Sequence, residues 1–194
     1  MRHDIHLDGH AFRLRPITDA DAQFVLALRC DPELTRYLHS TPPSLSDQLT
    51  WLAQYYARDG DYYFVVERKR DAKPEGLIAI YDVDETARAG EWGRWILRPG
   101  SLAAAESVLL IYRCGFELLD LKSLYCRTVA DNVKVVSFHD ACGIKRRREL
   151  PKFFELHGTK YDAIEHALDR TLWPEVAPKL ELPARAVARR MERG

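Results

Sequence analysis

Two segments of the sequence contain residues whose types and spacing could do chemistry. In the first, residues 90–101 (GEWGRWILRPGS), Glu91 stands close to Trp92 and Trp95. Burial against indole rings raises the pKa of a carboxyl group from its ordinary value of about 4.3. Glu91 could therefore act as a general base, directly or through a water molecule. A structural hydrogen bond at a strand edge is the alternative role for this side chain.

The second segment, residues 130–144 (ADNVKVVSFHDACGI), places a histidine on a helical pattern. About a quarter of unperturbed imidazoles are charged near pH 7, so His139 could donate a proton to a leaving group. The alternative is a histidine that only packs and orients a ligand. His39, in a loop, is a second candidate that only its position supports.

Between these two segments, a proline–glycine turn at Pro99 and Gly100 leads into a periodic helix. Backbone N–H groups at a helix N-terminus favour phosphate groups, and the small residues after Gly100 allow close approach. An ordinary turn that precedes a helix is the other interpretation.

Hydrophobic periodicity predicts the elements that must position these residues. We expect strands at 11–16, 62–68, 76–83, 91–97, 123–129, about 151–157 and about 160–168, and helices at 18–30, from 44, at 102–119 and at 132–142. The apolar stripes of the second and third helices are Leu45, Leu49, Leu52 and Tyr56, and Leu102, Ala105, Leu109, Tyr112, Phe116 and Leu119. The loop at 31–44 contains three prolines and could fold over a site.

This element order predicts a mixed α/β fold rather than a repeating Rossmann series. Acidic and basic residues balance at 29 each, which argues against a nucleic-acid or membrane partner. The short apolar runs and the lack of a signal-peptide core predict a cytoplasmic protein, and the four cysteines show no metal-ligand spacing. We expect one domain at residues 1–168 and a C-terminal tail at 169–194 that forms at most a short helix.

The two motifs and the element order resemble the GNAT superfamily of N-acetyltransferases. Residues 90–101 are similar to A-E-I-G-Y-x-[IV]-x-P, and residues 130–144 to N-x-x-[AS]-[IV]-x-[LF]-Y-x-x-x-G-F. The matching positions are Glu91, Gly93, Ile96, Asn132, Val136, Phe138 and Gly143. The resemblance covers about residues 11–166 and points to two branches, the ribosomal-protein N-terminal acetyltransferases and the amino-sugar acetyltransferases of the pseudaminic-acid pathway.

The resemblance implies a mostly antiparallel sheet whose fourth and fifth strands splay apart, with about four helices and acetyl-CoA in the gap. Its pantetheine arm would pair with the fourth strand, and its pyrophosphate would lie on the following turn. The residues this implies for cofactor binding are Trp95, Ile96, Leu97, Arg98, Gly100, Ser101, Leu102, Ala103, Ala104 and Asn132. This chain departs from the family pattern at Pro99 and Leu102 in the turn. It also departs at His139, where the family places a tyrosine that acts as the general acid.

The resemblance also implies that Glu91 and His139 act in catalysis on a primary amine, such as that of a nucleotide-linked amino sugar. We expect acceptor contacts from Tyr37, His39, Tyr81, Asp82 and Arg94. The KRRR run at 145–148 is interpreted as a solvated turn, although it could reach a diphosphate. Acetylation of a protein or peptide N-terminus, and a non-catalytic acyl-CoA-binding module, are the alternatives. A homodimer is also compatible with the sequence.

Overall fold

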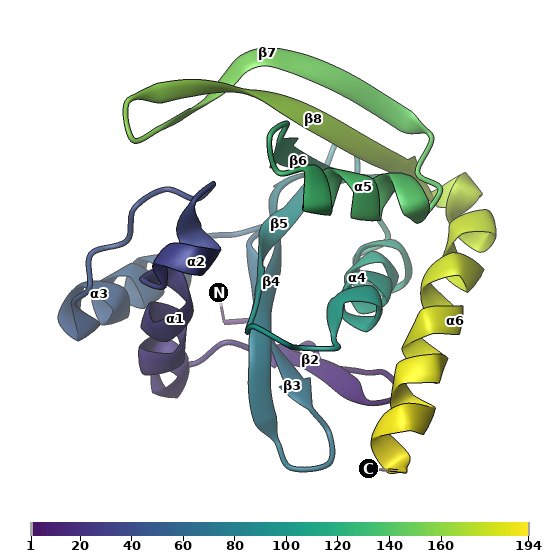
Figure 1. Cartoon of the computed structure of the whole chain (residues 1–194), viewed down its shortest axis with the longest axis horizontal. Helices are drawn as coiled ribbons and strands as arrows, with labels where there is room; N and C mark the ends of the chain where they lie inside the picture. Colours follow the sequence, from purple (N-terminus) through teal and green to yellow (C-terminus); the bar gives the residue numbers. More distant parts are fainter. Residues whose placement is uncertain (1, 194) are drawn as a thin grey trace.

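The computed structural model describes residues 2–193, which form one eight-stranded sheet with helices on both faces (Figure 1). The strand order is β1-β2-β3-β4-β5-β6-β8-β7, and only β5 and β6 pair in parallel. The strands are β1 (Leu7–Asp8), β2 (Phe12–Pro16), β3 (Tyr62–Arg68), β4 (Lys73–Asp84), β5 (Ala89–Leu97), β6 (Ser123–Val129), β7 (Arg146–Leu156) and β8 (Thr159–Asp169). The α-helices are α1 (Ala22–Arg29), α2 (Pro32–Thr35), α3 (Leu45–Tyr55), α4 (Ala104–Arg113), α5 (Val133–Ala141) and α6 (Trp173–Glu192). The predicted mixed, mostly antiparallel sheet is confirmed, with six α-helices where about four were expected.

The centre of the molecule is the meander β3-β4-β5, which the sequence predicted. Both faces of β3 and β4 are covered, so these strands carry continuous apolar runs instead of alternating ones. Val66 faces the core beneath α4 and α6, while its neighbour Val65 faces a second core beneath α1 and α3. The two cores hold the sheet rigid between helical layers.

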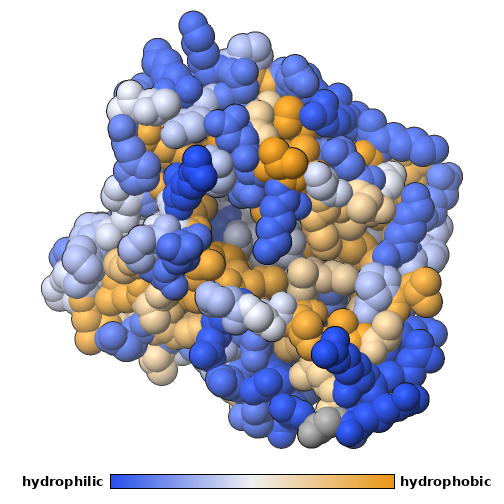
Figure 2. Space-filling view, in the orientation of Figure 1, coloured by the Kyte–Doolittle hydropathy of each residue, from blue (hydrophilic) through white to orange (hydrophobic). Residues whose placement is uncertain are grey.

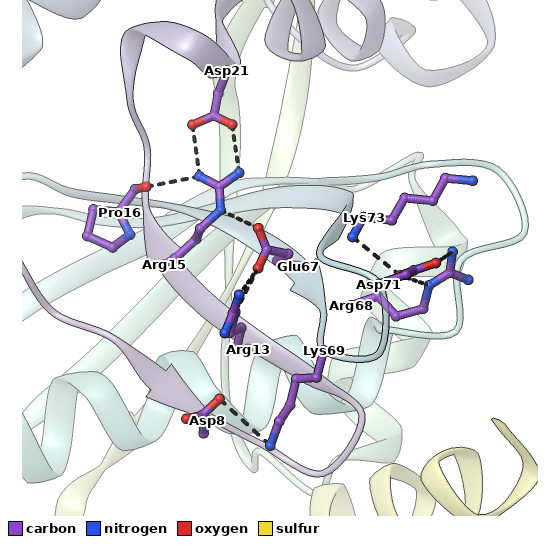
Figure 3. Close-up of polar contacts among 10 residues, drawn as sticks. All are labelled: Asp8, Arg13, Arg15, Pro16, Asp21, Glu67, Arg68, Lys69, Asp71 and Lys73. Atoms are coloured by element: carbon purple, nitrogen blue, oxygen red, sulfur yellow. Dashed lines mark hydrogen bonds and ion pairs between the residues drawn. The ribbon is translucent and has the colours of Figure 1, made fainter. Parts of the chain in front are cut away.

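A buried ion network joins β2 to β3 and to the start of α1 (Figure 3). The Arg15 guanidinium donates two hydrogen bonds to Asp21 at 2.9 and 2.7 Å and one to Glu67 at 2.5 Å. Arg13 donates to the other oxygen of Glu67 at 2.7 Å. Burial would raise the pKa of Asp21, but the bonds from Arg15 and Thr18 outweigh it and hold that pKa below its usual value. Removing one partner would leave an uncompensated buried charge. The network therefore fixes the position of the start of α1 relative to β2 and β3.

The predicted C-terminal tail is a long helix that belongs to the core. Helix α6 spans Trp173–Glu192 and packs along α4. Trp173 and Leu180 lie in the same core as the sheet, so the predicted boundary at 168 separates no structural unit among the described residues; positions 1 and 194 lie outside them. Pro178 and Pro183 lie on the exposed side of α6, where a helix can curve outward and tolerate a missing hydrogen bond.

Two further sequence predictions were wrong in detail. The inner face of α3 is formed by Gln48, Leu52 and Tyr55, whereas Leu45 and Leu49 are 46% and 38% exposed. The KRRR run is not a solvated turn, because β7 begins at residue 146 and pairs with β8. Within residues 2–193, no helix has the length and apolar character needed to cross a membrane.

Candidate active site

Strands β5 and β6 part at Glu91. Their parallel pairing consists of Ala89 with Ser123, Gly90 with Leu124 and Glu91 with Tyr125, and beyond it each strand runs on unpaired on that side. The β4–β5 register shifts where Leu77 pairs with Ile96 and Ala79 with Gly93, and Arg94 adopts a positive φ of 49° at this bulge. A bulge bends its strand and strengthens the twist, which turns β5 away from β6. The predicted splayed strands are therefore present.

The gap between the strands opens into a cavity of about 790 Å³. Figure 2 shows the surface hollowed near its centre, between the side that carries α1–α3 and the side that carries α5. The 31–44 segment, predicted as an irregular loop, contains the short helix α2, and its residues 37–42 line the cavity. The Tyr37 hydroxyl donates to the Asp131 carbonyl oxygen at 3.1 Å, and Ser40 lies 3.5 Å from His157 on the β7–β8 turn. The cavity is thus partly roofed, not an open groove.

Glu91 lies at the point of divergence and lines the cavity. Burial raises the pKa of its carboxyl group above the usual value, and the positive charge of Arg127 partly opposes that rise. The Arg127 guanidinium donates to Oε2 at 2.8 Å, and the Tyr81 hydroxyl donates to Oε1 at 3.2 Å. Arg127 also donates to Glu165 at 3.0 Å, which fixes its position. These contacts orient a carboxylate whose proton affinity is higher than that of an exposed glutamate.

His139 also lines the cavity, but it is almost fully buried. Its ring packs against Trp92, Trp95 and Phe138 at centroid distances of 5.3, 6.1 and 5.5 Å. Burial, with a smaller contribution from His166, lowers the pKa of His139 to about 3. The expectation of a partly charged imidazole near pH 7 is therefore wrong, because these apolar rings exclude the water that would stabilise the charge. His139 is held neutral beside the gap.

The turn after β5 leaves fewer free donors than the resemblance implies. Gly100 has a φ of 77°, which suits glycine, and no side chain caps the first turn of α4. However, the Ser101 N–H donates to the Arg98 carbonyl at 3.1 Å, and the Ala103 N–H donates to the Ser101 hydroxyl at 3.3 Å. Leu102 projects into solvent. The N–H groups at the start of α4, from Ala104 onward, are the donors best placed for an anion.

The other residues predicted for the cofactor lie along the gap. Trp95 lines the cavity and donates from its indole nitrogen to the Ser107 hydroxyl at 3.1 Å. Ile96 and Leu97 follow on the stretch of β5 that has no β6 partner. Asn132 lines the cavity on the opposite side, at the start of α5, and its side chain does not cap that helix.

The structure brings four of the five predicted acceptor residues to the cavity. Tyr37, His39, Tyr81 and Arg94 line it, whereas Asp82 is exposed and lies outside the lining. Arg94 is already paired, because it donates to both oxygens of Asp61 at 2.6 and 2.9 Å. Its guanidinium also lies 4.6 Å from the centre of the Tyr81 ring. Arg94 therefore shapes the wall of the cavity more than it offers a free charge.

Sequence reasoning missed several lining residues. Trp51 on α3, Arg29 at the end of α1 and Arg127 on β6 all line the cavity. Arg29 donates to the Thr41 hydroxyl at 2.7 Å and to the His39 carbonyl at 3.2 Å, and within residues 2–193 no carboxylate forms an ion pair with it. Arg127 carried one usable signal, since it is the only charged residue in the strand at 123–129.

Comparison with known proteins shows the family to which this fold belongs. The family model described as an acetyltransferase (GNAT) domain matches residues 12–145, well over half of the chain. The chain belongs to the GNAT acetyltransferase family. It is an N-acetyltransferase by this membership, and GNAT enzymes act on amines.

Relatives within the GNAT family differ in their acceptors. The spermidine N(1)-acetyltransferase of Escherichia coli K12 is 26% identical over 160 residues, which cover 80% of this chain and 84% of that protein. An uncharacterized N-acetyltransferase of Bacillus subtilis, YoaA, is 27% identical over 158 residues, 77% of this chain and 88% of its own. The apo structure of FdhC, a nucleotide-linked sugar GNAT, superposes with a TM-score of 0.74 at 27% identity, over 89% of this chain and 94% of FdhC.

Proposed function

We propose that this GNAT enzyme transfers the acetyl group of acetyl-CoA to the primary amine of a small anionic acceptor, and that a nucleotide-linked amino sugar is the class that fits. The proposal rests on the charge and shape of the cavity. The likeness to FdhC, at 27% identity, supports it.

The charged side chains that line the cavity are mostly positive. They are four arginines, Arg29, Arg58, Arg94 and Arg127, and two carboxylates, Asp47 and Glu91. Arg58 and Arg94 pair with Asp61, and Arg127 pairs with Glu91. Arg29 is therefore the lining arginine whose charge would act on an acceptor, and it would disfavour a polyamine such as spermidine. A diphosphate would find in Arg29 a guanidinium that binds only neutral oxygens, and guanidinium groups match phosphate oxygens well.

Aromatic rings supply the second part of acceptor recognition. Trp51 and Tyr55 stack with an interplanar angle of 6°, and the edge of Tyr63 meets Trp51 at 5.8 Å between centroids. Trp51, Tyr63 and Tyr81 line the cavity, and such faces suit a nucleobase or a sugar ring. The roof formed by the 31–44 loop favours a small acceptor over a long peptide, which would need an open groove.

The co-substrate would enter along the free side of β5. Backbone groups of Trp95, Ile96 and Leu97 would pair with its pantetheine arm, since no protein strand pairs with this stretch on the β6 side. The N–H groups at the start of α4 would receive the pyrophosphate, assisted by the freedom of Gly100. The acetyl thioester would then lie between Glu91 and His139.

In the reaction the amine nitrogen attacks the thioester carbonyl, the new C–N bond forms and the C–S bond breaks. Glu91 accepts the proton that the amine loses, directly or through a water, while Arg127 and Tyr81 keep its carboxylate oriented. The departing thiolate needs a proton, and His139 is the predicted donor. A neutral imidazole can give up its N–H only if it receives a proton at its other nitrogen.

A panel of acceptors tests this proposal, with thiol release measured at fixed acetyl-CoA. We expect kcat/KM for a nucleotide-linked amino sugar to exceed that for spermidine and for a peptide by at least about tenfold, or ~1.4 kcal/mol. The Glu91→Gln variant serves as the control for uncatalysed thiol release. A preference for the peptide would support N-terminal acetylation instead. Acetyl-CoA binding without transfer to any amine would identify a non-catalytic module. The cytoplasmic location and the homodimer remain predictions from the sequence.

A further inference from the structure

Two buried histidines lie side by side behind the cavity. His139 on α5 and His166 on β8 have ring centroids 5.2 Å apart, and their exposed fractions are 1% and 0%. His139 lines the cavity, whereas His166 does not. His166 is thus a titratable group placed directly behind the predicted acid, and the reaction described above assigns it no role.

Asp140 connects His166 to the surface. Its Oδ1 atom lies 2.9 Å from His166 Nε2, and the side chain of Asp140 is 48% exposed. Because a carboxylate only accepts, this contact makes Nε2 of His166 the nitrogen that carries a proton. Arg147 on β7 lies 3.7 Å from the same Asp140 oxygen, and together these are the charged groups packed round the pair. Trp92, Trp95 and Phe138 cover His139 on its other sides.

One nitrogen of each ring is buried and unsatisfied. Among the described residues, Nδ1 of His139 and Nδ1 of His166 are buried and have no hydrogen-bond partner. Leaving one buried polar atom unpaired costs about 1–3 kcal/mol, and this site carries two such atoms on adjacent rings. An arrangement with this cost is understandable if a proton or a water molecule occupies the space between the rings during the reaction.

We propose that Asp140 and His166 form a proton relay that supplies His139 and, through it, the departing thiolate. This inference rests on the proposed acetyl transfer. In the relay, doubly protonated His166 gives its Nδ1 proton to Nδ1 of His139 through one water, because the two Nδ1 atoms do not contact each other directly. His139 gives its Nε2 proton to the thiolate sulfur, and so it stays neutral overall. After the products leave, a water in the cavity protonates Nε2 of His139, and the Nδ1 proton of His139 returns to Nδ1 of His166, so both rings regain their starting forms while Asp140 balances the charge on His166. The proton taken from the amine leaves by way of Glu91, so the charges balance.

Variants of the relay separate this role from a structural one. We expect His166→Gln to lower kcat about 10- to 100-fold, up to the lower limit of what positioned general acids contribute because His166 acts through His139, with KM for acetyl-CoA unchanged. Asp140→Asn, which keeps the size of this half-exposed side chain, should lower kcat about three- to tenfold. His6→Gln and Asp169→Asn are matched controls, because His6 is exposed and Asp169 pairs with an arginine on the same hairpin.

The acetyl selenoester of coenzyme A gives the decisive readout. A selenol is a much stronger acid than a thiol, so the selenolate departs without being protonated. We expect this donor to restore His166→Gln and Asp140→Asn to within about threefold of wild type, since only the acid step is bypassed. An equal loss with both donors would make the roles structural and overturn the relay. Unchanged kcat in both variants of an active enzyme would also overturn it. An enzyme whose wild-type form transfers acetyl to no amine would overturn the proposed function, and the relay with it.

Discussion

The surroundings of Glu91 have two opposite effects on its pKa, and the expected pH dependence of activity follows from their balance. Burial raises the pKa of the carboxyl group and Arg127 lowers it, so the group titrates above the usual range for glutamate. The deprotonated form is the base, and activity should therefore fall as pH drops through this raised pKa. Arg127→Met removes the opposing charge and should move the acid limb of the kcat/KM profile to higher pH by about one unit.

Arg148→Met is the matched control for this shift. Arg148 binds Glu165, the second carboxylate that Arg127 holds, but it does not contact Glu91. Its variant should keep the wild-type acid limb. An acid limb that moved equally in both variants would show that the general loss of positive charge matters, not the pairing with Glu91.

His139 links pH to stability as well as to chemistry. The folded protein holds this ring neutral, with a pKa of about 3, whereas the unfolded chain protonates it below about 6.5. Protons therefore bind preferentially to the unfolded state, and the free energy of unfolding falls as pH drops below 6.5. The upper limit is about 1.4 kcal/mol per pH unit.

The His139→Tyr variant should lose this contribution. We expect its unfolding free energy, measured by urea titration between pH 7 and 4.5, to fall less steeply than that of wild type. His6→Gln, at an exposed site, should keep the wild-type slope. Equal slopes in all three proteins would contradict the neutral buried imidazole. Turnover retained in His139→Tyr would support its equivalence with the tyrosine of the family pattern.

At the scale of elements, helix α6 has no residue assigned to catalysis or binding, but its buried side chains should contribute strongly to the stability of the fold. Leu180 is 1% exposed and packs in the core, whereas Leu182, two residues on, is 68% exposed. Leu180→Ala should lower the free energy of unfolding by about 2–5 kcal/mol, and Leu182→Ala should change it by less than about 0.5 kcal/mol. Urea denaturation of the two variants measures the difference. Similar values for both would mean that α6 is not part of the cooperative core.

The types of the elements could be predicted where hydrophobic periodicity and residue propensity agreed. The predictions failed where tertiary contacts determined the structure. The strand at 123–129 was predicted with its observed bounds, because buried and partly buried positions alternate along most of it and many of its side chains are bulky. Helix α6 was not predicted at its full length because Pro178 and Pro183 argue against a helix, and the sequence alone does not show that they face solvent. The stripe of α3 was assigned to Leu45, Leu49, Leu52 and Tyr56, yet its inner face is formed by Gln48, Leu52 and Tyr55, and Gln48 lines the cavity.

At the scale of the whole molecule, the divergence of β5 and β6 could be predicted, but the set of side chains that line the cavity could not. The gap between β5 and β6 was predicted from the resemblance of two short motifs to the GNAT family. The cavity wall gathers side chains from α1, α3, β5 and β6. No single stretch encodes that meeting. This explains why Arg29 and Trp51 were missed, and why the pairing of Arg94 with Asp61 was not predicted when Arg94 was expected to contact the acceptor.

The whole chain carries 29 basic and 29 acidic residues, so attraction of an anionic acceptor must come from the cavity itself. Arg29→Met should raise KM for the anionic acceptor about tenfold and leave KM for acetyl-CoA unchanged, because a charge-assisted contact to phosphate is worth ~1.5 kcal/mol or more. Arg113→Met makes the same charge change on α4, outside the cavity lining, and should leave both constants unchanged. The acceptor KM of wild type should also rise with salt, and that of Arg29→Met should rise less. If both variants raised the acceptor KM alike, Arg29 would not be the group that recognises the acceptor.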